Sequence, residues 1–150
     1  MKAYLSLGSN LGDREQNLHR ALQLLNEPRL RLLRQSQIRE TEPVGVENQP
    51  RYLNLAAEFD SELFPLQLMR HCLSVEAQLG RRRIGARTPR TIDIDLILYG
   101  EWRINLPELT VPHPRYATRR FVLEPLLEIS PDLRDPVTGA PLRRLLSCIQ

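Results

Sequence analysis

Apolar residues at helical spacing predict two helices in the first half of the chain. Leu18, Leu22 and Leu25 lie on one face of the segment 13–26, and Pro28 ends that segment. A second helix begins at Pro65, a residue suited to the first helical position, and runs to about residue 80. The apolar face predicted for this second helix consists of Leu66, Met69, Leu73 and Leu79.

Alternating or β-branched apolar residues predict four strands, which are the segments 2–7, 30–41, 52–59 and 91–99. The first strand ends in a turn cluster at 8–12. The loop 43–50 carries two prolines and a glycine, and it allows the second and third strands to form an antiparallel hairpin. The predicted order is therefore β-α-β-β-α-β.

This order is the split βαβ pattern of the ferredoxin-like α+β fold, with helices and sheet in an α-β-α layered arrangement. About fifty residues follow as a C-terminal elaboration, in which short helices are expected at 119–129 and 142–149. A chain of 150 residues suits one domain, 1–150, with a full-sized core. Because this fold hosts many functions, the motifs have to identify the chemistry.

The stretch 80–100 has two unlike halves. The first half is a loop that contains five arginines and no carboxylate; the arginines are Arg81, Arg82, Arg83, Arg87 and Arg90. The second half is the strand 91–99, in which Asp93 and Asp95 interrupt an apolar run. On a strand these two carboxylates share one face about 7 Å apart. The residues expected to face the core instead are Ile92, Ile94, Leu96 and Leu98.

Two carboxylates this close repel each other unless cations or hydrogen-bond donors stabilise both charges. Magnesium prefers one or two carboxylates together with substrate phosphates, and arginines neutralise the charge that develops in phosphate transfer. Asp93, Asp95 and the basic loop are therefore consistent with metal-assisted phosphate transfer. A solvated edge strand beside a solvated basic loop explains the same spacing, so the pair alone does not decide.

Composition says more about the expected cellular location of the protein than about its function. The net charge of +3 suits an anionic ligand without singling out nucleic acid. The chain has no apolar run of 18 residues and no signal-like segment, so we expect a cytoplasmic protein that neither crosses a membrane nor binds one. Cys72 and Cys148 both lie in apolar helical patterns and are expected to be reduced packing residues.

Four groups of residues together resemble the family of 6-hydroxymethyl-7,8-dihydropterin pyrophosphokinases, enzymes of the folate pathway. The groups are Gly8-Ser9-Asn10-Leu11-Gly12, Thr41 to Gly45 with Gln49-Pro50 and Tyr52-Leu53-Asn54, Pro89 to Asp95, and Leu109 to His113 with Arg119 and Phe121. They follow the family's order over nearly the whole chain. The segment P-R-T-x-D-x-D, followed about fifteen residues later by T-V-P-H, is a specific pairing.

The resemblance implies transfer of a diphosphate from ATP to a pterin alcohol, with AMP as the leaving group. It implies that Asp93 and Asp95 are catalytic residues that bind two magnesium ions, and that Arg81 and Arg90 assist the transfer. The implied nucleotide-binding residues are Arg83, Arg87, Leu96, Thr110, His113 and Arg119. The implied pterin-binding residues are Thr41, Val44, Tyr52, Asn54 and Phe121.

Within this implied site, Tyr52 and Phe121 would stack on the two faces of the flat pterin ring. Asn54 carries both an amide donor and an acceptor and would read the hydrogen-bonding edge of the ring. The expected partners are therefore small-molecule substrates and not nucleic acid, and the protein is expected to act as a monomer.

The sequence departs from the family pattern at three places. The segment Arg87-Thr88-Pro89 makes the basic loop one residue shorter and lacks the tryptophan that many relatives carry there. Glu108 stands where familiar members have an arginine near the nucleotide, and Pro114 stands where some have a tyrosine. These differences concern affinity and rate more than the reaction itself.

Two other functions fit parts of the pattern. A metal-dependent nucleotidyltransferase also combines a Gly-Ser turn with D-x-D, but there the two motifs lie close together, whereas Gly8-Ser9 precedes Asp93 by more than eighty residues. A ferredoxin-like RNA-binding module would require exposed aromatics in a K/R-G-F/Y-G/A-F-V-x-F/Y strand, and the sequence contains none.

Overall fold

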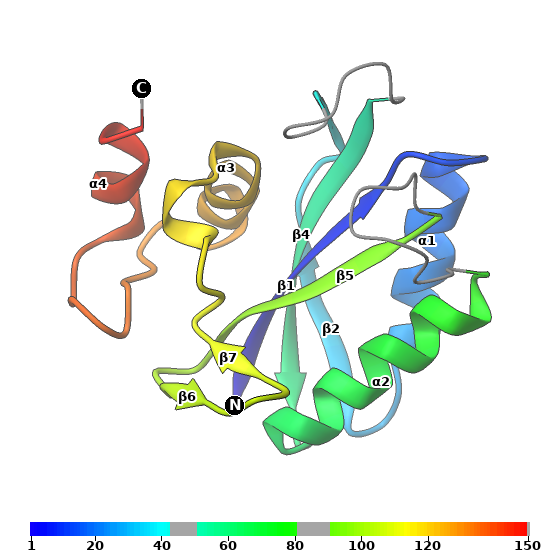
Figure 1. Cartoon of the computed structure of the whole chain (residues 1–150), viewed down its shortest axis with the longest axis horizontal. Helices are drawn as coiled ribbons and strands as arrows, with labels where there is room; N and C mark the ends of the chain where they lie inside the picture. The colour runs from blue at the N-terminus through cyan, green and yellow to red at the C-terminus, as the bar shows by residue number, and fades with distance from the viewer. Residues whose placement is uncertain (43–50, 81–90, 150) are drawn as a thin grey trace.

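A central antiparallel sheet separates two layers of helices in this computed structural model (Figure 1), which describes residues 1–42, 51–80 and 91–149. The strands lie in the order β2 (Leu30–Gln35), β4 (Tyr52–Ser61), β1 (Lys2–Ser9) and β5 (Asp93–Tyr99), and β3 (Arg39–Thr41) also pairs with β4. Together with the two helices between the strands, this arrangement confirms the predicted ferredoxin-like α+β fold.

One face of the sheet is covered by α1 (Arg14–Leu25) and α2 (Pro65–Gln78). The side chain of Asp13 caps α1 by accepting a hydrogen bond of 3.1 Å from the backbone N–H of Gln16. Leu18, Leu22 and Leu25 are buried against the sheet, as the spacing predicted. Each fully buried leucine contributes about 1.5–3 kcal/mol to folding. The apolar cluster on this face is the larger of the two in the described structure.

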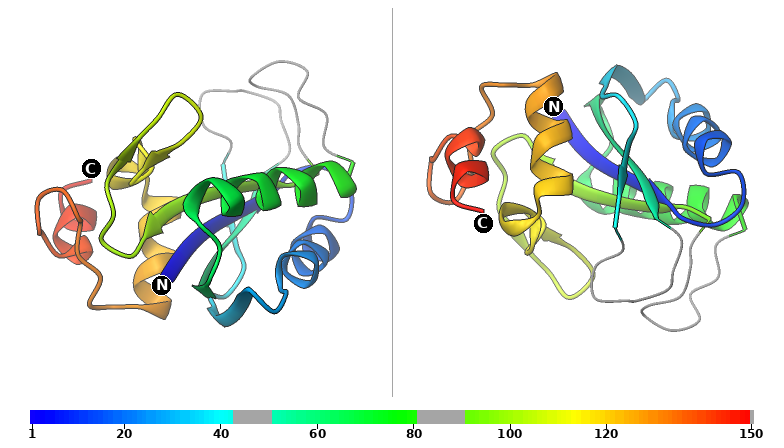
Figure 2. Two further views of the ribbon diagram at one scale, coloured as in Figure 1. Left: turned by 90° about the horizontal axis from the view of Figure 1, so that it is seen from below. Right: turned by 90° about the horizontal axis from the view of Figure 1, so that it is seen from above.

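The opposite face of the sheet is covered by α3 (Arg120–Ile129) and α4 (Leu142–Ser147). The view from above in Figure 2 shows α3 and α1 on opposite sides of the strands. A short 3₁₀ helix, η1 (Tyr116–Thr118), leads into α3. The second apolar cluster joins Tyr4, Ala56, Ile97 and Leu98 of the sheet to Val122, Leu123 and Leu126 of α3.

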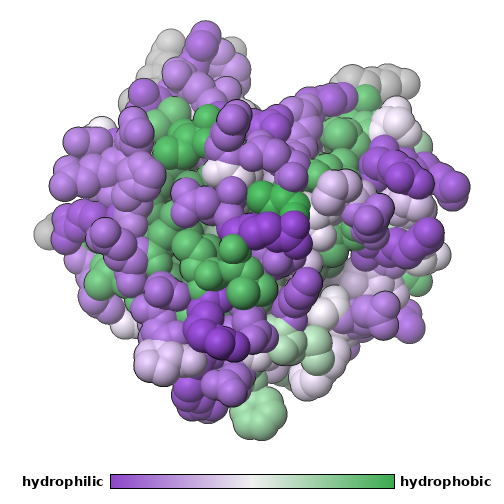
Figure 3. All heavy atoms as spheres, turned by 180° about the vertical axis from the view of Figure 1, so that it is seen from behind, coloured by the Kyte–Doolittle hydropathy of each residue, from purple (hydrophilic) through white to green (hydrophobic). Residues whose placement is uncertain are grey.

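The strand β5 forms one edge of the sheet, and a small hairpin packs beside it. This hairpin pairs β6 (Ile104–Asn105) with β7 (Thr110–Val111) and was not predicted from the sequence. In the view from behind, hydrophilic residues cover most of the described surface and apolar residues gather in separate areas (Figure 3). None of the described helices is both long enough and apolar enough to cross a membrane.

The predicted second strand is wrong in its continuity, because the segment 30–41 forms two strands. Ser36 lies between them, where its hydroxyl accepts a hydrogen bond of 2.9 Å from the backbone N–H of Ala56. Its own N–H donates to the carbonyl of the same alanine at 2.8 Å. The serine side chain thus replaces a backbone group of the ladder.

The predicted apolar face of α2 is confirmed for Leu79, which is buried in the core, and for Leu66 and Met69, which pack against it, but it is wrong for Leu73. Leu73 is 38% exposed, whereas Leu68, Cys72 and Val75 are buried in the core. The helix is apolar on more than one side, so spacing alone did not select every residue that faces the sheet. The prediction for Cys72 holds, but Cys148 is exposed at the end of α4 and is not a packing residue.

The expectation that Leu98 shares a face with Ile94 and Leu96 is wrong. The pairing of β1 with β5 changes register after Leu96, so that Leu5 lies opposite Leu96 and Tyr4 opposite Leu98. The irregularity turns Leu98 to the α3 side of the sheet, while Ile94 and Leu96 stay in the first cluster. Asp93 and Asp95 precede this irregularity.

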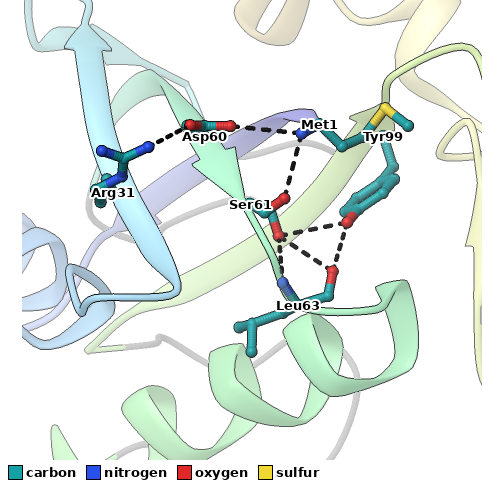
Figure 4. A network of polar contacts seen from close by, with 6 residues as sticks. All are labelled: Met1, Arg31, Asp60, Ser61, Leu63 and Tyr99. Atoms are coloured by element: carbon teal, nitrogen blue, oxygen red, sulfur yellow. Dashed lines mark hydrogen bonds and ion pairs between the residues drawn. The ribbon is translucent and has the colours of Figure 1, made fainter.

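A polar network fixes the end of the sheet where the chain begins (Figure 4). The carboxylate of Asp60 accepts hydrogen bonds from Arg31 at 2.6 Å and from the N-terminal ammonium at 3.4 Å. These two cations hold the pKa of Asp60 below its ordinary value. The network lies on the β2–β4 pair, at the opposite end of β1 from Gly8.

Candidate active site

The edge strand β5 presents Asp93 and Asp95 on the face of the sheet that is opposite α1 and α2. Both carboxylates are half-buried. Asp93 lies opposite Gly8 of β1, and Asp95 lies opposite Ser6. The two acids therefore share one face, as predicted, and they have small residues as neighbours across the strand pair.

A buried glutamate that the sequence analysis missed supports this strand. Glu76 of α2 is only 2% exposed, and its Oε2 accepts a hydrogen bond of 2.8 Å from the backbone N–H of Ile94. Ile94 is the residue between the two aspartates, so Glu76 fixes the backbone that carries them. A carboxylate on the buried side of an amphipathic helix was the signal in the sequence, because such a group is rarely buried without a partner.

On one side of the aspartates, the structure brings together three of the residues assigned to the pterin. Thr41 of β3 pairs with Tyr52 of β4, and the side-chain amide of Asn54 donates a hydrogen bond to the Thr41 hydroxyl. Asn54 is 5% exposed and lies opposite Gly8. A Cβ atom at Gly8 would stand 3.0 Å from Asn54 Oδ1 and 3.3 Å from the Tyr52 ring, so glycine permits this close approach.

Phe121, the second aromatic residue assigned to the pterin, comes from α3, which packs on β4. It is half-buried against the second apolar cluster, and the Arg119 guanidinium lies 5.6 Å from its ring centroid. Arg119 and Phe121 thus lie together at the start of α3.

On the other side of the aspartates, a pocket of about 670 Å³ lies along the edge of β5. Its volume is in the range of small-molecule sites. Four of its lining residues, Asp95, Leu96, Thr110 and His113, belong to the predicted site. The other lining residues are Met69, Cys72, Leu73, Ile94, Pro107, Glu108, Leu109 and Pro114.

His113 is held in one orientation by backbone groups. The backbone N–H of His113 donates to the backbone carbonyl of Ile97 at 3.0 Å, and this bond connects the segment after β7 to the edge strand β5. Its Nδ1 accepts a hydrogen bond of 3.2 Å from the backbone N–H of Arg115. In the neutral ring the proton is therefore on Nε2, which can donate to an acceptor such as a phosphate oxygen.

The pKa of His113 is lowered from its ordinary value of 6.5, because burial and the nearby Arg119 disfavour the charged ring and outweigh the attraction of Asp93. The unfolded chain therefore binds a proton at a higher pH than the folded chain does. As the pH falls from about 6.5 through the lower folded pKa, the stability contribution of the neutral ring is lost.

We therefore expect the melting temperature to fall between pH 7 and pH 5, and to fall less in the variant His113→Asn. Asparagine keeps an acceptor near the position of Nδ1 and does not titrate. Thermal unfolding of both proteins across this range measures the difference. Parallel pH profiles would show that His113 does not contribute.

The carboxylate oxygens of the two aspartates are suitable ligands for a hard cation that binds together with substrate. Within the described residues no cluster of three or more His, Cys, Asp or Glu side chains forms a complete metal site. Two carboxylates on one strand face are what magnesium uses when phosphates and waters supply its other ligands. Thr91 Oγ1, two residues before Asp93, is buried and has no hydrogen-bond partner within the described ranges.

The remaining predicted site residues lie outside the described residues. They are Val44, Arg81, Arg83, Arg87 and Arg90. Thr88, at the shortened part of the basic loop, lies outside them as well.

Comparison with known proteins identifies one family. The family model described as 7,8-dihydro-6-hydroxymethylpterin-pyrophosphokinase matches residues 4–131. The 2-amino-4-hydroxy-6-hydroxymethyldihydropteridine pyrophosphokinase of Bacillus subtilis is 42% identical over 139 residues, which are 92% of this chain and 83% of that protein.

Longer proteins also contain a region similar to this chain. The folic acid synthesis protein fol1 of Schizosaccharomyces pombe is 40% identical over 145 residues, but the chain spans only 20% of its length. The crystal structure of Plasmodium falciparum HPPK-DHPS with pteroate superposes with a TM-score of 0.78 over 97% of this chain and 42% of that one. At 14% identity, this structure supports the fold alone.

Proposed function

This chain belongs to the 7,8-dihydro-6-hydroxymethylpterin-pyrophosphokinase family, the enzymes that transfer pyrophosphate from ATP to hydroxymethyldihydropterin in folate biosynthesis, and we propose that Asp93 and Asp95 hold two magnesium ions for that transfer. The magnesium ions would supply positive charge beside the triphosphate. The two carboxylates lie on one face of β5 and supply hard oxygen ligands, which supports this assignment.

The observation that carries the proposal is the position of Asp95 between two binding surfaces. Asp95 lines the pocket at the edge of β5 together with Thr110 and His113. With Asp93 it also faces the side of the sheet where Asn54 lies opposite Gly8. A nucleotide in the pocket and a pterin on that side of the sheet would therefore meet at the aspartates.

In this arrangement the chain acts by orienting two substrates. The hydroxymethyl oxygen of the pterin attacks the β-phosphorus of ATP, the bond from that phosphorus to the oxygen of the α-phosphate breaks, and AMP leaves while the hydroxyl proton passes to solvent. His113 Nε2–H and Arg119 would donate to phosphate oxygens. Phosphate transfer depends chiefly on positioning and on neutralising charge, and these groups supply both.

The pterin would lie between Tyr52 and Phe121 with its edge on Asn54. Because Asn54 Nδ2 donates to Thr41, its Oδ1 is held on the side of Gly8, where it would accept from an N–H or amino group of the pterin. The edge of a pterin presents donors and acceptors side by side, which an amide can match with both its atoms.

We also propose that the enzyme acts as a monomer in the cytoplasm on these small molecules. The residues assigned to both substrates come from this one chain. Cys72 and Cys148 are both free thiols, which is consistent with a reducing compartment.

The direct test is identification of the nucleotide product. With ATP, magnesium and 6-hydroxymethyl-7,8-dihydropterin, we expect AMP and the pterin diphosphate ester, detected by phosphorus NMR. When the pterin is omitted, nucleotide turnover should fall at least about 100-fold, because the reaction is a transfer and water is a poorly positioned acceptor. ADP as the product would exclude pyrophosphate transfer.

A further inference from the structure

An arginine outside the predicted site links the two elements that carry the proposed pterin-binding residues. Arg39 of β3 donates from Nη1 to Glu124 Oε2 at 2.8 Å and from Nη2 to Glu128 Oε1 at 2.9 Å. Both glutamates belong to α3. We call these three residues the Arg39 clamp. A guanidinium suits this role because its donors diverge in a fixed plane and can bind two carboxylates at once.

The clamp continues along the backbone beside β3. Glu128 Oε2 accepts a hydrogen bond of 2.7 Å from the backbone N–H of Gln37. Gln37 thus contacts Glu128, and Arg39 contacts Glu128 and Glu124. The chain from residue 37 onward therefore runs along α3 toward the N-terminal end of that helix, in the direction of Phe121.

Helical periodicity places Phe121 on the same side of α3 as the clamp. Residues 121, 124 and 128 are three and four positions apart and so share one helix face. On the sheet, Arg39 lies opposite Asn54, and Thr41 lies opposite Tyr52. The clamp is therefore one turn of α3 away from Phe121 and two strand residues away from Thr41.

We propose that Arg39 is a positioning residue for the pterin, which fixes the separation between Phe121 on α3 and the wall formed by Thr41, Tyr52 and Asn54. This inference rests on the proposed function, because it takes the pterin to lie between those residues. Arg39 itself need not touch the substrate. Its effect is to hold a flat slot at the width of one ring system, so that little binding free energy is lost in ordering the two walls.

The surroundings of the clamp favour a positioning role over a purely stabilising one. The side chains of Arg39, Glu124 and Glu128 are 37%, 31% and 29% exposed. Ion pairs at this level of exposure contribute little to overall stability. The strand β3 has only three residues, each paired with β4, so the clamp is a substantial part of what relates β3 to α3.

The test compares Arg39→Met with the matched control Arg31→Met. Arg31 also projects from a strand beside β4 and pairs with a carboxylate, Asp60 (Figure 4), but it lies opposite Asp60, toward the other end of β4 from the Arg39 clamp. Methionine preserves most of the aliphatic length and removes the charge in both variants. The measurements are KM for each substrate, kcat, melting temperature, and calorimetric binding of the non-reactive 6-hydroxymethylpterin.

We expect Arg39→Met to raise KM and Kd for the pterin about tenfold, while KM for ATP stays within about twofold and kcat at saturation within about threefold. Its melting temperature should fall by no more than about 4 °C. Arg31→Met should leave the pterin constants unchanged. Arg39→Lys should bind the pterin with intermediate affinity, because an ammonium keeps the charge but lacks the planar fork.

A double-mutant cycle separates the clamp from other effects of Arg39. The variant Glu124→Gln/Glu128→Gln should raise KM for the pterin as Arg39→Met does, and combining all three changes should add little more. Additive effects, an equal rise in KM for both substrates, or a pterin Kd equal to that of Arg31→Met would each overturn the proposal. If the unmodified enzyme itself failed to bind 6-hydroxymethylpterin, the proposed function would fail with it.

Discussion

The variant Asp95→Asn is expected to lower kcat by about 10³-fold or more, because it removes a carboxylate from the place where we propose that the two substrates meet. Asparagine has nearly the same shape and keeps one side-chain oxygen, so the loss would reflect charge and not packing. Asp95 lines the pocket at the edge of β5 and shares a strand face with Asp93, opposite the small residue Ser6. Steady-state turnover with saturating ATP and pterin measures the effect.

The fold of this variant should be intact. Two neighbouring carboxylates repel each other, so removing one charge should leave the melting temperature unchanged or slightly higher. Asp132→Asn is the matched control, since Asp132 is exposed after the end of α3. It should retain full activity. If Asp95→Asn kept more than about a tenth of the wild-type kcat, the assignment of Asp95 to the metal site would be wrong.

The sequence predicted best where local chemistry sets the structure. Asp13 before α1 and the leucines at helical spacing act within a few residues of one another, so the start and buried face of this helix followed from the pattern. The aspartate pair shares one face of β5 for a similar reason, because alternation along a strand is a local rule.

Prediction failed where a distant element determined the outcome. The leucines of α2 could not show that Glu76 lies on its buried side, because the bond from Ile94 N–H is what makes burial of Glu76 acceptable. The register change that turns Leu98 to the other side depends on how β1 pairs with β5. Neither cause is visible within the helix or the strand itself.

The Arg39 clamp shows the same limit at the site. Arg39 is 85 residues from Glu124 and 89 from Glu128, and nothing in the local sequence joins them. The family resemblance indicated Tyr52 and Phe121 as the two walls of the pterin slot, but not what relates one wall to the other. That relation became visible only when β3 and α3 were seen to lie together.

Removing divalent metal should abolish turnover, with a loss of at least about 10³-fold in EDTA and full recovery on adding excess magnesium. The reason lies in the charges of this site. Asp93 and Asp95 face the position expected for the triphosphate, so three anionic groups would meet there without a cation. Unchanged activity in EDTA would exclude the magnesium assignment.

The same charges predict that magnesium reverses which protein, wild type or variant, binds an ATP analogue more tightly. Without metal, the double variant Asp93→Asn/Asp95→Asn should bind a non-hydrolysable ATP analogue about five- to tenfold more tightly than the wild type, because two repulsive charges are gone. With magnesium the order should invert, since only the wild type can hold the metal between its carboxylates and the phosphates. Calorimetric titrations of both proteins, with EDTA and with magnesium, give the four affinities. If magnesium strengthened binding equally in both proteins, the metal would be held by the nucleotide alone and the two aspartates would not be its ligands.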